Sequence, residues 1–455
     1  MKHFALRQYA AGVLGVALAM ACIAGPALSQ DSTDVAIGYA PTESPRSLAP
    51  PIQIAFFRAH DGRGINVFEA PKLERVEYTG FKIQWGAAFT QQFQSLAHEN
   101  TATPNVVGAV DLNQLIKMGP GFNNAEANLY MDVQLARGIR LALTSYLSSR
   151  HHSETWVKDG YLLVDGSPWA SAPLDSLMKH LTLRLGHFEI NYGDMHFRRT
   201  DNGEAMFNPL VGNLLMDAFT TEVGGELYAR GHNLLAMAAV TGGEVRGQVL
   251  KPENRSPAVI GKLGFDKAFN AHTRARLTGS IYSTSKSNNN TLYSGSRSGS
   301  RYYYVLENVN ATESAQAWSG DVQPGMSRKV TAWVINPFVT CHGLELFGNY
   351  EEAKGRNGVE TKDRKFKQLA GEAVYRFVGN HVYLAGRFNQ VKGRFAGQTA
   401  DVTVERMQAG GGVFLTQNLE TKLEYVQQKY LDYPATDIRN GGTFSGIMFE
   451  AVVSF

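Results

Sequence analysis

The chain ends with IMFEAVVSF, residues Ile447 to Phe455, and this stretch decides the fold. Its alternate positions are apolar or aromatic: Ile447, Phe449, Ala451, Val453 and Phe455. A period of two is typical of a β-strand whose two faces meet different surroundings. A strand at the end of a chain leaves an open edge that invites aggregation unless another strand covers it. We therefore expect the last strand to pair with the first strand of a closed barrel.

The same alternation recurs from Phe81 to the C-terminus in segments of about ten residues, the weak repeating signature of a membrane β-barrel. In the first segment one face carries Phe81, Ile83, Trp85, Ala87, Phe89 and Phe93. The other face carries Lys82, Gln84, Gly86, Thr90 and Gln92. Later segments place charged residues on the polar face of so many strands that they require a polar lumen. The sequence therefore predicts an all-β, transmembrane antiparallel barrel over residues 79–455.

The N-terminus indicates export. Lys2 and Arg7 precede a mostly apolar run, and Ala27-Leu28-Ser29 offers the small residues of a cleavage site. We expect residues 1–29 to be a secretory signal peptide, because the apolar run is too short for a spanning helix. The whole chain has a formal net charge of only +3, and Lys2 and Arg7 leave with the signal. Such near-neutrality gives no support for nucleic-acid binding.

Connection lengths give a count of the strands, because barrels have short periplasmic turns and longer outer loops. Tight connections fall at 136–138, 230–232, 341–343, 378–380 and 416–418, and long polar ones fall near 242–257, 284–329, 352–365, 392–401 and 429–443. Fifteen segments are clear, and the order of short and long fails only between Arg150 and Phe219. The best candidate for a missing descending strand is Glu154 to Val164, which predicts about sixteen strands, an even number as single-chain bacterial barrels have.

Two features resemble known families. A final Phe in a strand resembles the terminal signal that the assembly machinery of bacterial outer-membrane barrels reads. The arrangement TWVKDGYLLVD, a connection and LTLRLGHFEINYGD resembles general and phosphate-selective-type outer-membrane porins. The resemblance implies an inward-folded constriction loop over residues 191–218, passive diffusion of small hydrophilic solutes, and a homotrimer. The loop carries no Lys-rich cluster, so its residues do not support phosphate selectivity.

The expected constriction loop carries charges of both signs. His196, Arg198 and Arg199 would supply positive potential, and the opposing wall would be Asp194, Asp201 and Glu204. Clusters of fixed charge can select solutes by the sign of their charge. The alternative is that Arg198 and Arg199 pair with nearby acids and hold the loop in place.

Basic residues also recur on the polar faces of the strands. They are Arg140, Arg184, Arg274, Arg276, Arg387 and Arg406, and they could extend a basic track along the lumen. For most of them we favour cross-strand pairing with acids such as Asp132, Glu372, Glu405 and Glu424.

Three segments lie outside the strand pattern. Residues 30–78 read as a periplasmic or lumen-entering extension, or as a loosely ordered tail. The tract Ser287 to Ser300 is too poor in apolar residues to order itself. The run Tyr302-Tyr303-Tyr304 could stack on sugars, but we favour a place in an aromatic girdle at the membrane interface.

No spacing of nucleophile, base and acid marks an enzyme, and the scattered histidines do not imply a shared metal ion. We therefore expect no enzymatic activity, no metal and no cofactor. The leading hypothesis is a channel of the bacterial outer membrane for passive diffusion of small hydrophilic solutes or ions. The alternatives are a plugged structural or adhesive barrel and an outer-membrane hydrolase. Expected partners are outer-membrane lipid, the assembly machinery through Phe455, the solutes and further copies of the chain.

Overall fold

The computed structural model describes residues 57–69, 78–123, 125–148, 155–169, 171–245, 251–296, 301–312 and 319–455. The expected signal peptide and residues 30–56 lie outside this described part. Among the described residues, no helix is long and apolar enough to cross a membrane.

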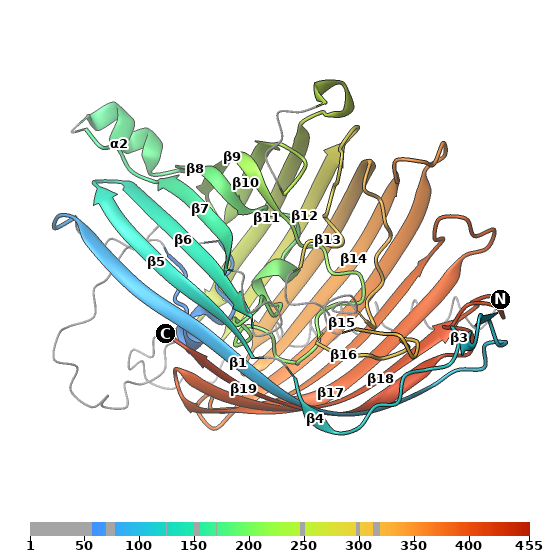
Figure 1. The fold of residues 1–455 in the computed structure, drawn as a ribbon. Helices are drawn as coiled ribbons and strands as arrows, with labels where there is room; N and C mark the ends of the chain where they lie inside the picture. The colour runs from blue at the N-terminus through green and yellow to red at the C-terminus, as the bar shows by residue number, and fades with distance from the viewer. Residues whose placement is uncertain are drawn as a thin grey trace.

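Sixteen long strands form one closed antiparallel sheet, as the sequence predicts (Figure 1). They are β1 (Lys82–Glu99), β5 (Glu126–Ala136), β6 (Ile139–Ser148), β7 (Thr155–Val164), β8 (Leu181–Glu189), β9 (Thr221–Gly231), β10 (Leu234–Thr241), β11 (Ala258–Asn270), β12 (Thr273–Thr284), β13 (Lys329–Cys341), β14 (Leu344–Arg356), β15 (Arg364–Phe377), β16 (Val382–Gly393), β17 (Val402–Thr416), β18 (Leu419–Leu431) and β19 (Thr443–Ser454). A two-residue strand, β4 (Gly121–Phe122), pairs with β1 beyond the end of β5. Strands β2 (Val106–Val107) and β3 (Val110–Asp111) form a separate hairpin.

The barrel closes where the terminal sequence predicts. Strand β19 pairs with β1 in a continuous register that runs from Ala88 opposite Ser454 to Glu99 opposite Thr443. The last residue also takes part, because the amide of Phe455 donates to the Ala87 carbonyl at 2.9 Å and the Ala87 amide donates back at 3.0 Å. The edge of the last strand is therefore covered by the first.

The barrel wall is apolar on its outer face and polar on its inner face, the reverse of a water-soluble protein. Trp85, Leu263 and Leu384 on the outer face are 60–69% exposed, whereas Thr90 and Gln92 on the inner face are at most 1% exposed. A water-soluble sandwich would bury the apolar face, so this arrangement fits a wall with lipid outside and a polar interior. The alternation predicted for β1 is confirmed.

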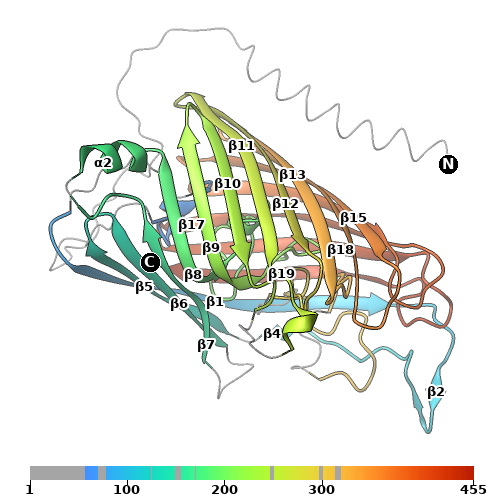
Figure 2. The same ribbon diagram turned by 90° about the horizontal axis from the view of Figure 1, so that it is seen from above.

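Connections of two lengths alternate around the barrel. Turns of two residues at 232–233, 342–343 and 417–418 lie at the same end as the C-terminus, and most of the longer connections lie at the opposite end. The exception is the connection at 165–180, which lies at the turn end. Strand β7 occupies the place predicted for the missing strand and leads through helix α2 (Ala172–Met178) into β8. Figure 2 shows α2 and the C-terminus at one end of the barrel and the β2 hairpin at the other.

The tract in the loop between β12 and β13 is ordered where it is described, contrary to the prediction from composition. Asn290 is 5% exposed, and its side-chain amide donates to the Tyr282 hydroxyl at 2.6 Å and to the Gly243 carbonyl at 3.1 Å. The tract is poor in apolar residues, but Leu292 and Tyr293 pack into the interior and the polar inner wall supplies hydrogen-bond partners.

The reversed wall predicts a depth-dependent penalty along a single strand. Leu423 is 57% exposed in the apolar stretch of β18, and Leu431 is 39% exposed at the loop end of the same strand. We expect Leu423→Arg to lower the free energy of unfolding by about 2–4 kcal/mol and Leu431→Arg by at most about 1 kcal/mol. Equilibrium unfolding in lipid vesicles measures both, and equal penalties would contradict a lipid-facing belt.

Candidate functional site

The loop between β8 and β9 crosses the interior of the barrel. Nearly every residue from 191 to 218 is buried. Its amides and carbonyls meet opposite walls: the Asp194 amide donates to Asn336 on β13 at 2.8 Å, and the Asp201 carbonyl accepts from Asn128 on β5 at 3.0 Å. The structure therefore places this loop inside the lumen, in contact with walls on both sides.

Local sequence sets the path of the loop. Residues 195–197 form a single 3₁₀ turn after Asp194. Asp201 and Glu204 then close a tight turn through reciprocal backbone hydrogen bonds of 2.8 and 3.0 Å. Asn202 in this turn has φ 55°, a left-handed conformation that asparagine tolerates better than most residues.

Asp194 is the best-connected carboxylate of the loop. Both of its oxygens accept from the Arg276 guanidinium, at 2.8 and 2.9 Å, and it also contacts Lys262 and the Thr278 hydroxyl at 2.8 Å each. It is 0% exposed. Burial alone would raise the pKa of this carboxyl, but the adjacent Lys262 and Arg276 cations hold it below its usual value.

Arg198 lies in a balanced group of charges on the side of β14 and β15. Its guanidinium is 2.7 Å from Glu372 and 3.2 Å from Glu345. Arg387 contacts the same Glu372 at 2.5 Å, and Arg376 contacts Glu345 at 2.6 Å. Arg198 is 2% exposed, and both of its acidic partners belong to wall strands.

Arg199 belongs to a second group, which includes two acids of its own loop. It contacts Asp217 at 2.6 Å and Asp201 at 3.2 Å. Asp201 is also bound by Lys158 of β7 and by the Tyr146 hydroxyl of β6. Arg199 and Asp201 therefore share one cluster, which matches the alternative that the loop arginines pair with nearby acids.

The two remaining loop residues also have partners. Glu204 accepts from the Tyr130 hydroxyl at 3.0 Å. The His196 ring lies 2.9 Å from the Asn191 side-chain oxygen and 3.4 Å from Glu189. Burial lowers the pKa of His196. For Arg198 and Arg199 the geometry matches the alternative of pairing with acids, and their role in selectivity stays a prediction.

The six wall arginines face inward and each pairs with an acid. Their partners are Asp165 for Arg140, Glu226 for Arg184, Asp266 for Arg274, Asp194, Glu69 and Asp266 for Arg276, Glu372 for Arg387 and Asp321 for Arg406. These pairs leave no continuous basic track among the described residues.

Of the four acids that the sequence analysis offered as cross-strand partners, only Glu372 pairs with one of these arginines. Asp132 faces His60 at 3.3 Å. Glu405 accepts from Gln390 at 2.7 Å, and Glu424 accepts from the Val211 amide of the loop at 2.7 Å.

A second segment, residues 57–69, also lies within the barrel. The Gly62 amide donates to Gln417 in the β17–β18 turn at 2.9 Å. Glu69 contacts Lys262 at 3.1 Å and Arg276 at 2.8 Å, so it shares both cations with Asp194. The described part of the extension thus occupies the lumen from the turn end, and it is not a loose tail.

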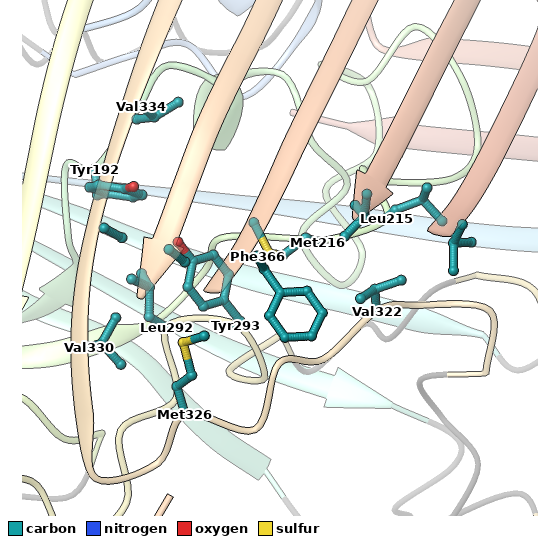
Figure 3. Close-up of a cluster of buried hydrophobic side chains, with 14 of the residues drawn as sticks. Tyr192, Leu215, Met216, Leu292, Tyr293, Val322, Met326, Val330, Val334 and Phe366 are labelled. Carbon is teal, nitrogen blue, oxygen red and sulfur yellow. The ribbon is translucent and has the colours of Figure 1, made fainter. Parts of the chain in front are cut away.

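Tyr302 corrects the expected aromatic girdle. It is 0% exposed inside the barrel, and its hydroxyl donates to Glu424 at 2.5 Å. The long loop therefore folds inward as well. Figure 3 shows the apolar cluster that joins these segments, in which Leu215 and Met216 of the crossing loop lie with side chains of the long loop and the wall. A strand-period pattern cannot distinguish a girdle from such inward packing.

Open space remains between the inserted segments and the wall. A cavity of about 150 Å³ is lined by residues that include Arg58, Phe68, Tyr161, Arg184, His196 and Tyr228. Four further members of these charge groups are not among the residues predicted from the sequence: Glu69, Asp217, Lys262 and Glu345. Lys262 and Glu345 could have been found from their inward-facing positions in β11 and β14, whereas Glu69 and Asp217 lie in segments without periodicity.

No family model matches the chain, and no curated protein matches it. Among solved structures, it is similar to an anion-selective porin from Comamonas acidovorans, with 10% identity, a TM-score of 0.49, and coverage of 82% of this chain and 100% of that one. It is also similar to OmpT, an outer membrane protein of Vibrio cholerae, with 9% identity, a TM-score of 0.48 and coverage of 84% and 99%. A third is the outer membrane channel DcaP of Acinetobacter baumannii, with 9% identity, a TM-score of 0.45 and coverage of 83% and 99%. The barrel topology follows from the strand pairing of the chain itself.

Asp194→Asn tests whether buried ion pairs fix the loop. The substitution leaves Lys262 and Arg276 short of one negative charge, and breaking such a buried pair costs about 3–5 kcal/mol of unfolding free energy. A matched control is Asp401→Asn, which removes a carboxylate from an exposed pair with Arg394 and should cost at most about 1 kcal/mol. Denaturant unfolding in detergent measures both, and equal effects would contradict the anchoring role of Asp194.

Proposed function

We propose that the chain is a porin-type channel of the bacterial outer membrane, through which small hydrophilic solutes or ions diffuse passively. The observation that carries this proposal is the polarity of the closed sixteen-strand wall, which is apolar outside and polar inside. A barrel of this size encloses more interior than its own wall side chains fill. Hydrophilic solutes need such a polar interior, and lipid needs the apolar exterior.

The inserted segments determine what could pass. Residues 191–218 and 57–69 narrow the interior, and the walls around them carry balanced groups of charges such as Arg198 with Glu345 and Glu372. Paired charges of both signs attract polar solutes and reject apolar ones without a strong preference for one sign. We therefore propose a narrow channel for small solutes and do not propose phosphate selectivity.

A second candidate function is the plugged barrel, which would serve surface attachment or envelope organisation. The specific observation in its favour is the burial of the crossing loop: Arg198 and Arg199 are each 2% exposed. In the plugged barrel the ion pairs would seal the lumen. In the channel, solutes would move through the gaps that the paired segments leave open.

The proposed setting includes several partners. Outer-membrane lipid would surround the apolar belt, the assembly machinery would read Phe455, and three copies would form a trimer. The proposed activity needs no cofactor and performs no chemistry. The hydrolase alternative centred on residues 146–154, and Tyr146 of that stretch is buried in the lumen beside Asp201. Residues 149–154 lie outside the described part.

Planar lipid bilayers test the proposed channel. Folded protein should give stepwise ion conductance, and under a salt gradient Arg198→Gln with Arg199→Gln should shift the reversal potential toward cations, because two positive charges leave the narrowed region. The control is Arg137→Gln with Arg394→Gln, which removes two exposed arginines from connections and should leave the potential unchanged.

The outcomes separate the two candidates. Absence of conductance steps in protein that is folded by circular dichroism would overturn the channel and support the plugged barrel. Conductance with an unchanged reversal potential would keep the channel and reject the selectivity role of the two loop arginines.

A further inference from the structure

We propose that the outer wall at the loop end of β14, β15 and β16 binds the phosphorylated head group of an anionic lipid in the outer leaflet. Four residues, Lys354, Lys365, Lys367 and Lys392, form what we call the lysine cluster. The proposal rests on the membrane setting of the barrel, but not on its conductance.

Strands β14, β15 and β16 are neighbours in the wall (Figure 1), and the lysine cluster lies on their outer face. All four lysines are exposed, and each follows the outward-facing register of its strand. Lys354 lies directly opposite Lys365, and Lys367 lies directly opposite Lys392. The four ammonium groups therefore gather on one patch near the ends of the strands.

Few acids neutralise this patch. Glu352 contacts Lys365 at 2.5 Å and Lys367 at 3.9 Å. Within the described ranges, neither Lys354 nor Lys392 has an acid at ion-pair distance. Like charges directly opposite each other on adjacent strands are destabilising. An anion bound between them would remove that cost, which makes the patch complementary to phosphate.

The wall is hollowed at the same place. A depression of about 750 Å³ is lined by Tyr350, Lys365, Lys367, Leu369, Lys392 and Arg394, together with other polar residues. Its two acids are already engaged, because Asp363 contacts Lys329 at 2.7 Å and Asp401 contacts Arg394 at 3.1 Å.

The depression joins charge to apolar surface. Leu369 and Tyr350 lie further from the loop end than Lys365 and Lys367, in the direction of the apolar belt. A ligand with phosphates beside the lysines would thus place its acyl chains against Tyr350 and Leu369. That combination of groups belongs to a phosphorylated lipid, since free phosphate would use only the lysines.

The cluster is confined to one sector of the barrel. On β9 to β12 the outward residues nearest the loop end are uncharged: Val223, Val240, Val259 and Ser283. If the lysines served only to keep the rim soluble, they would not need to gather on β14 to β16. It indicates that one side of the barrel is built for an anionic neighbour.

Binding of a bisphosphorylated diacyl glycolipid to the folded protein in non-ionic detergent, followed by native mass spectrometry and titration, tests the proposal. The variant is Lys365→Gln, Lys367→Gln and Lys392→Gln together. We expect it to weaken binding roughly 100-fold, since each of the three basic residues near a charged surface contributes about a factor of five. The control variant is Lys251→Gln, Lys267→Gln and Lys286→Gln, which removes three charges elsewhere and should bind like the wild type.

Two further ligands identify the source of the phosphate. The same glycolipid without phosphates and inorganic phosphate alone should both bind much more weakly than the bisphosphorylated lipid. Equal binding of either ligand, or an equal loss in the two variants, would overturn the proposal. Circular dichroism confirms that each variant is folded, and bilayer conductance of the cluster variant should be unchanged, so a failure here is distinct from failure of the channel.

Discussion

The structure depends on one electrostatic constraint: charges enclosed by the barrel wall must be neutralised by one another. The wall is apolar outside across the belt that would face lipid, so charged groups of the strands at that depth point inward. Removing an ion from water costs several kcal/mol unless a partner and hydrogen bonds replace the water. Asp194 with Lys262 and Arg276, and Arg198 with Glu345 and Glu372, satisfy this requirement between loop and wall. The pairs fix the position of the crossing loop more than they add net stability.

This constraint explains why the inserted segments differ in sequence and yet share the same interior. Glu69 from the N-terminal segment and Asp194 from the crossing loop share the cations Lys262 and Arg276. Arg301 of the long loop pairs with Glu126 of β5. Each segment thus depends on charges that another segment or the wall provides. In the proposed channel a solute would meet this balanced lining, and a partial displacement of one segment would expose charges of the others.

The sequence predicted those parts of the structure that depend on local periodicity. The strand from 154 to 164, the closure at Phe455 and the outward apolar face all follow from a period of two and from the alternation of turns and loops. The contacts of the inserted segments do not follow from local periodicity, because Asp217 and Tyr302 lie in stretches without a period. Tyr302 also meets a partner, Glu424, that is more than a hundred residues away in the sequence. Arg199 and Asp201 illustrate the limit: pairing of Arg199 with a nearby acid was one of two alternatives from the sequence, but the wall partners of Asp201, Lys158 and Tyr146, required the three-dimensional path of the loop.

Hydrogen–deuterium exchange of the folded protein tests the central claim most directly, because it reports on the crossing loop itself. If the ion pairs hold residues 191–218 across the lumen, peptides from this loop should remain protected as long as peptides from β14 to β16. Peptides from the exposed connection at 394–401 should exchange first. Exchange of residues 191–218 as fast as that connection would contradict a loop fixed by buried charges.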